Sequence, residues 1–166
     1  MKICILKETT QNEKRVALVP DVAKKLINDG FEVFIESGAG KQSDFSDEDY
    51  TGVGVTAAEA DKIIPNADII FSVKMPNIDS IKKMKAEACL IGLLNPYDNH
   101  EQLKALSENN VNAFSMELVP RSPRAQSMDV LSSQSNLAGY KAIVDSSSMF
   151  NRAMPMMMTA AGTIAP

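Results

Sequence analysis

The chain has 166 residues, of which 45% are hydrophobic and 23% charged, and its net charge is −4. This length fits one compact domain with a sizeable core, and the composition is ordinary for a soluble protein. Because no basic stripe with interleaved aromatic residues occurs, the sequence argues against nucleic acid as a partner.

The sequence also argues against a membrane segment. No window reaches the roughly 18 apolar residues that a membrane-spanning helix needs. The opening residues, MKICILKE, pass directly into an apolar strand pattern and leave no room for a signal peptide. We therefore expect no membrane segment in the chain itself, and a cytoplasmic location.

Short apolar runs alternate with amphipathic stretches along the chain. The apolar runs predict strands at residues 2–7, 31–35, 67–73, 88–94 and 111–118. Helical spacing and stop signals predict helices at residues 19–28, 57–64, 78–86, 101–106 and 135–150. This alternation predicts an α/β fold of three layers: a mostly parallel, Rossmann-like or flavodoxin-like sheet with helices on both faces, followed by a C-terminal linking helix. Ligand-binding groups are expected at the carboxyl ends of the strands.

A glycine-rich segment at residues 37–43, SGAGKQS, follows the second predicted strand and looks at first like a dinucleotide-binding turn. The fingerprint requires a third glycine where Ser43 stands. The acidic residues that follow, Asp44, Asp47 and Glu48, would repel a pyrophosphate. We interpret the segment as a tight turn before an acid-rich helix start.

Neither sulfur-containing residue type predicts a metal or redox site. Cys4 and Cys89 each lie within an apolar run, which favours core thiols over a disulfide or redox pair. The methionine cluster at residues 154–158 has no accompanying cysteine or histidine ligands, so packing is favoured and no metal centre is expected.

Polar side chains gather most densely in residues 120–134, PRSPRAQSMDVLSSQ, which join the last predicted strand to the linking helix. The cluster comprises Arg121, Arg124, Gln126, Asp129, Ser132, Ser133 and Gln134. Chemistry alone supports two interpretations equally. The segment is a binding site, or it is a helix start capped by Ser132 or Ser133 in which Asp129 pairs with a nearby arginine in a surface turn.

Residues 151–166 are apolar and rich in methionine, without a helix cap or a charged end. Such side chains need a surface to pack against, so we expect the chain to belong to a larger two-domain protein. We predict an N-terminal α/β domain at residues 1–134, with the linking helix and the start of a connection at residues 135–166.

Three segments resemble the superfamily of alanine dehydrogenase and proton-translocating nicotinamide nucleotide transhydrogenase: KETTQNEKRVALVP at 7–20, RAQSMDVLSSQSNLAGYKAI at 124–143 and MPMMMTAAGTIAP at 154–166. The second and third resemble the transhydrogenase branch. The resemblance covers the whole chain and implies the first domain of an NAD(H)-binding alpha subunit. It further implies a Rossmann domain with the glycine fingerprint beyond Pro166.

The alanine dehydrogenase branch needs a residue that this sequence lacks. In that branch, counterparts of Arg15 and Lys74 bind pyruvate, and a histidine corresponding to Leu94 or Asn95 transfers the proton. The chain's one histidine, His100, lies further on at an expected helix start, and we interpret it as a solvated surface residue. Without that catalyst, Arg15 and Lys74 are expected to make structural hydrogen bonds.

A transhydrogenase passes hydride directly from NADH to NADP+, so its task is to hold two nicotinamide rings in contact. The resemblance implies that Arg121, Gln126, Asp129 and Ser132 surround the nicotinamide of NAD(H), with Gln126 and Asp129 as the catalytic residues. Gln126 and Ser132 can pair with the carboxamide, and the charge of Asp129 favours the oxidised ring.

The resemblance also implies partners. NADP(H) is expected on a partner component, and a beta or membrane component is expected to couple hydride transfer to proton translocation. The chain would form a homodimer peripheral to the inner membrane. Two alternatives stay open: a non-catalytic folding or interaction module that binds little nucleotide when isolated, and an alanine dehydrogenase N-terminal domain.

Overall fold

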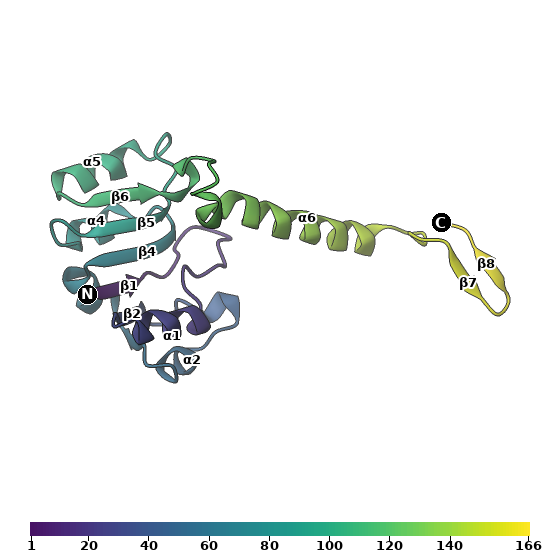
Figure 1. Cartoon of the computed structure of the whole chain (residues 1–166), viewed down its shortest axis with the longest axis horizontal. Helices are drawn as coiled ribbons and strands as arrows, with labels where there is room; N and C mark the ends of the chain where they lie inside the picture. Colours follow the sequence, from purple (N-terminus) through teal and green to yellow (C-terminus); the bar gives the residue numbers. More distant parts are fainter. The chain divides into compact units, whose positions relative to one another are not determined.

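The computed structural model describes residues 1–166, which divide into two compact units, Met1–Pro120 and Arg121–Pro166 (Figure 1). No helix of the chain is both long enough and apolar enough to cross a membrane. The two units are described separately below.

The first unit is built on one six-stranded sheet. Its strands are β1 Lys2–Ile5, β2 Glu32–Glu36, β3 Thr56–Ala58, β4 Ile69–Lys74, β5 Cys89–Leu93 and β6 Asn112–Ser115. They lie in the order β3-β2-β1-β4-β5-β6, and every neighbouring pair is parallel (Figure 1). The strand order reverses between β1 and β4, which places the carboxyl ends of these two strands at the topological switch point of the sheet.

Helices cover both faces of this sheet. They are α1 Pro20–Asn28, α2 Asp47–Thr51, α3 Ala60–Ile63, α4 Ile78–Lys83 and α5 His100–Glu108. Alternate residues of β1 point to opposite faces. Leu6, just after β1, packs with α3, α4 and α5 in one core, whereas Ile5 packs with α1 and α2 in another. The three-layer parallel α/β fold predicted from the sequence is thereby confirmed.

One predicted helix was partly wrong. Residues 57–64 were expected to be helical, but Thr56–Ala58 forms the edge strand β3 and only Ala60–Ile63 forms α3. The alanines of this segment favour a helix and carry no alternating pattern. Pairing of Phe34 with Thr56 at the sheet edge decides the strand, which is a tertiary effect that local sequence does not contain.

The strand expected at residues 111–118 is also shorter than predicted. β6 ends at Ser115, and a 3₁₀ helix follows at Met116–Leu118. Of the two cysteines, Cys4 is buried and Cys89 half-buried, and both are free thiols, as expected. Burial raises the pKa of the Cys4 thiol to about 12, which makes it unreactive.

The second unit consists of a 3₁₀ helix at Gln126–Met128, the 20-residue helix α6 at Val130–Met149, and a β-hairpin. The helix begins five residues before the predicted start at residue 135. The hairpin strands are β7 Met157–Thr159 and β8 Gly162–Ile164, which pair antiparallel (Figure 1). The hairpin was not predicted, because methionine and alanine give no strand period.

Candidate functional site

The polar segment at residues 120–134 forms the start of the second unit. Asp129 is the residue before α6 and acts as its N-cap, because its Oδ1 accepts the backbone N–H of Ser132 at 2.9 Å. The hydroxyl of Ser132 donates to Oδ2 of Asp129 at 2.7 Å, and that of Ser133 donates to the Asp129 carbonyl at 3.2 Å. A cap was expected from Ser132 or Ser133. Asp129 takes that position because the helix begins at Val130.

These contacts set the charge of Asp129. Donation by the Ser132 hydroxyl and backbone N–H, with a smaller contribution from the positive charge of Arg121, holds the pKa of Asp129 below its usual range. Asp129 is therefore ionised at neutral pH. The expected interaction with Arg121 exists as an electrostatic influence within this unit.

Gln126 lies one turn before Asp129, at the first position of the 3₁₀ helix. Its backbone carbonyl accepts the N–H of Asp129 at 3.3 Å, while its side chain is exposed and makes no hydrogen bond in the structure. The structure thus brings together Asp129 and Ser132 directly, places Arg121 near enough to act on their charge, and leaves the Gln126 amide available.

A second polar cluster lies at the carboxyl ends of β1 and β4, in the first unit. The Glu8 carboxylate accepts two backbone N–H groups, from Val73 at 2.5 Å and from Lys74 at 3.1 Å. The register of β4 against β5 shifts between Phe71 and Lys74, and Glu8 binds the chain at that irregularity. Burial raises the pKa of Glu8 despite these two hydrogen bonds.

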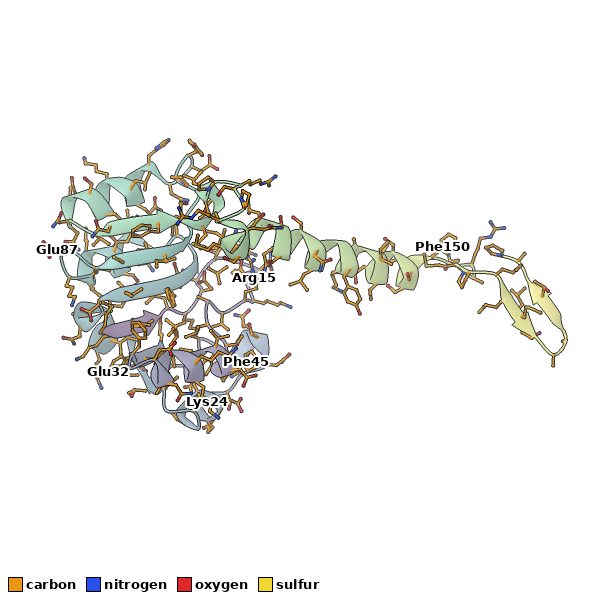
Figure 2. All side chains as sticks on the ribbon, in the orientation of Figure 1. Arg15, Lys24, Glu32, Phe45, Glu87 and Phe150 are labelled. Carbon is orange, nitrogen blue, oxygen red and sulfur yellow. The ribbon has the colours of Figure 1, made fainter.

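Arg15 belongs to the same cluster and is labelled in Figure 2. Its Nε and Nη2 atoms donate to the two carboxylate oxygens of Glu13, each at 2.7 Å, in a bidentate ion pair. The hydrogen bonds from Arg15 lower the pKa of Glu13. The structural hydrogen bonding expected for Arg15 is therefore confirmed.

Lys74 lines a small cavity of about 80 Å³ between the ends of β1 and β4. Glu8 and Ser72 also line it, and the buried Ser72 hydroxyl has no hydrogen-bond partner. Sequence reasoning did not single out Glu8 or Glu13. The signals were present: Glu8 follows an apolar strand directly, and Glu13 is two residues from Arg15.

The position that would carry a catalytic histidine holds none. Leu94 is buried after β5, and Asn95 donates its backbone N–H to Glu117 in a left-handed turn with φ 43°. His100 is the exposed first residue of α5, as expected. Proton transfer at the end of β5 would need another group.

The glycine segment at residues 37–43 is a tight turn, as interpreted from the sequence. Gly38 has φ 73°, and its N–H donates to the Asp47 carboxylate at 2.9 Å. A carboxylate thus occupies the donor that a dinucleotide-binding turn would offer to a phosphate.

Comparisons with known proteins identify relatives along the whole chain. A family model described as alanine dehydrogenase/PNT, N-terminal domain, matches residues 4–138. An NAD(P) transhydrogenase subunit alpha protein from Rickettsia prowazekii is 45% identical over 169 residues, which cover 99% of this chain and 44% of the relative.

Two solved structures extend this comparison. The crystal structure of transhydrogenase from Sinorhizobium meliloti matches with a TM-score of 0.92 and 43% identity, over 99% of this chain and 49% of that chain. An L-alanine dehydrogenase matches with a TM-score of 0.69 and 28% identity, over 75% of this chain and 34% of that chain. The chain spans less than half the length of each of these relatives.

Proposed function

Because this chain belongs to the alanine dehydrogenase/PNT family, as an N-terminal domain of that family, we propose that it is a component of a proton-translocating NAD(P)+ transhydrogenase. In this proposal it supplies the nicotinamide side of an NAD(H) site for direct hydride transfer between NADH and NADP+. The observation that carries the proposal is the ionised Asp129 with its Ser132 contacts, one turn after an unpaired Gln126 amide.

The transhydrogenase branch is favoured over alanine dehydrogenase on two grounds. The relatives named as transhydrogenases match nearly the whole chain at higher identity. The strand end after β5 carries Leu94 and Asn95, so the proton-transfer residue of an amino-acid dehydrogenase is missing.

The residues present fit a nicotinamide. Its carboxamide has one acceptor and two donor hydrogens, and the free Gln126 amide offers the complementary groups. The nicotinamide supplies the hydride chemistry when it is bound. Gln126 orients the ring, Ser132 supports that orientation, and the negative charge of Asp129 stabilises the positively charged oxidised form relative to the neutral reduced form. Arg121 balances that carboxylate.

The proposal extends to the rest of the protein. Residues 1–134 form the N-terminal α/β domain, and residues 135–166 form the linking helix and the start of the connection to a Rossmann domain that holds the remainder of NAD(H). NADP(H) lies on a partner component, and a membrane component couples the reaction to proton translocation. The assembly is a homodimer at the cytoplasmic face of the inner membrane.

The alternative functions predict different binding. A titration of NADH into the 166-residue chain, followed by the fluorescence of the reduced nicotinamide, distinguishes them. We expect binding far weaker than that of a protein extended by a Rossmann domain. Equal affinity in the two proteins would contradict the division of the site between domains.

The role of Asp129 is tested in the extended protein with partner components present. Asn is as good a helix N-cap as Asp, so Asp129→Asn removes the charge and keeps the cap, whereas Asp129→Ala removes both. We expect both variants to lose hydride transfer, while only Asp129→Ala loses helicity in α6. If Asp129→Asn transferred hydride at the rate of the parent protein, the charge would have no role and Asp129 would be a cap alone.

A further inference from the structure

Helix α6 is the longest element of the chain, yet none of its 20 residues is buried. Four large apolar side chains on it are exposed, and Tyr140, at 71%, is the most exposed of them: Leu137, Tyr140, Ile143 and Val144. Figure 2 shows side chains standing out along the length of α6. Serines recur through the helix and Gly139 lies near its middle, so its own residues favour helix only weakly. Packing on another surface is needed to stabilise it.

The exposed apolar residues lie on one side of α6. Leu137, Tyr140 and Val144 are separated by three and four residues, which is the spacing of the a and d positions in a helix–helix seam. Ser133 and Ser147 continue the same spacing and allow a partner helix to approach closely. This row of residues, 133, 137, 140, 144 and 147, is called the α6 seam below.

Charges on α6 restrict what can cover the seam. Between Val130 and Met149 the only charged residues are Lys141 and Asp145, which form an ion pair within the helix. They lie beside the seam, and their midpoint is Ile143. A partner helix therefore meets an apolar strip bordered by one positive and one negative charge.

A second copy of the same helix satisfies this pattern in one orientation. An antiparallel pair with its two-fold axis at Ile143 places Lys141 opposite the partner's Asp145, and symmetry repeats the contact in reverse. The same register places Leu137 opposite the partner's Met149. A parallel pair would instead place Lys141 beside the partner's Lys141, where like charges repel.

We propose that the α6 seam is a self-association surface on which a second copy of this chain packs antiparallel about Ile143. This inference rests on the homodimer of the proposed function and specifies its surface and register. Its test uses neither nucleotide nor activity, so a failure here leaves the hydride-transfer proposal standing.

The first experiment measures the mass of the 166-residue chain by sedimentation at high micromolar concentration. We expect twice the 18.0 kDa of one chain. Lys141→Glu leaves two acidic residues beside the seam of each copy, and Asp145→Lys leaves two basic ones, so each variant alone is expected to be a monomer. An equimolar mixture of the two variants should recover the dimer mass. A monomeric parent chain, or two variants that both remain dimers, would overturn the proposal.

The second experiment tests the register by cross-linking with a short bis-maleimide. Val144→Cys lies near the proposed axis, whereas two copies of Leu137→Cys would be separated by about 18 Å along the helix at about 1.5 Å per residue. We expect Val144→Cys to give covalent dimers and Leu137→Cys to give few. Efficient cross-linking of Leu137→Cys would contradict the antiparallel register. The parent chain, with buried Cys4 and half-buried Cys89, provides the background.

Discussion

Replacement of Glu8 tests how the first unit holds the carboxyl ends of β1 and β4. Glu8→Ala removes the acceptor of two backbone N–H groups, from Val73 and Lys74. Hydrogen bonds to a charged group contribute about 1.5–3 kcal/mol each when buried. Glu8 is only partly buried, so solvent screening reduces the sum, and we expect a loss of about 2 kcal/mol in the free energy of unfolding. For a chain of this size the melting temperature should fall by about 4–8 °C.

Thermal and urea denaturation followed by circular dichroism measure this loss. Glu32→Ala is the matched control, because Glu32 is an exposed glutamate on β2 with no side-chain hydrogen bond in the structure. It should unfold within about 0.5 kcal/mol of the parent protein. If Glu8→Ala also remained within that range, the Glu8 carboxylate would not stabilise the end of β4, and the reasoning would be refuted.

Glu8 also gives a pH signature. Burial raises its pKa above the unfolded value, so ionisation of Glu8 opposes folding at pH values above the folded pKa. That opposing contribution disappears once the pH falls below the unfolded pKa. The parent protein should therefore gain stability relative to Glu8→Gln as the solution is acidified, which paired urea titrations at neutral and acidic pH would detect.

The remaining predictions concern an ion pair and two glycines. The pKa of Glu13 is lowered by its hydrogen bonds from arginine, so its stabilisation is present above the unfolded pKa and is lost as pH falls through the folded pKa; Glu13→Gln should remove that part of the acid sensitivity in a pH series of urea titrations. A Cβ at Gly92 would overlap the carbonyl oxygen of Ser72, so Gly92→Ala should destabilise the protein by about 1–3 kcal/mol in thermal denaturation. Gly139→Ala meets no atom within 4 Å and should instead raise the stability of α6 by about 1 kcal/mol; a loss of α6 helicity, read by hydrogen exchange, would contradict the open environment.

The alternation of apolar runs with helical stretches was enough to predict the central sheet and its three layers. The runs at residues 2–7, 67–73 and 88–94 become β1, β4 and β5, which are buried on both faces and so are apolar throughout. Edge elements were harder to predict. β3 has only three residues, and its pairing partner in β2 is about 20 residues away in sequence, where local patterns do not reach.

The candidate site shows the same division between local and distant information. A helix start near Asp129 could be predicted from local polar residues, but the choice of Asp129 over Ser132 as the cap depends on the residue at which α6 begins. The contact of Glu8 with Val73 joins residues 65 positions apart. No spacing rule could have predicted it, because it depends on the neighbouring positions of β1 and β4 in the sheet.

The central claim is that the polar segment before α6 orients a nicotinamide, and hydride transfer measures it most directly. The assay follows reduction of an NADP+ analogue by NADH, with the chain extended by its Rossmann domain and reconstituted with partner components. Gln126→Ala should slow hydride transfer by about tenfold or more, because loss of orientation separates the reacting atoms. Arg124→Ala, an exposed neighbour outside the proposed site, should retain the parent rate. Equal rates for Gln126→Ala and the parent protein would contradict the account.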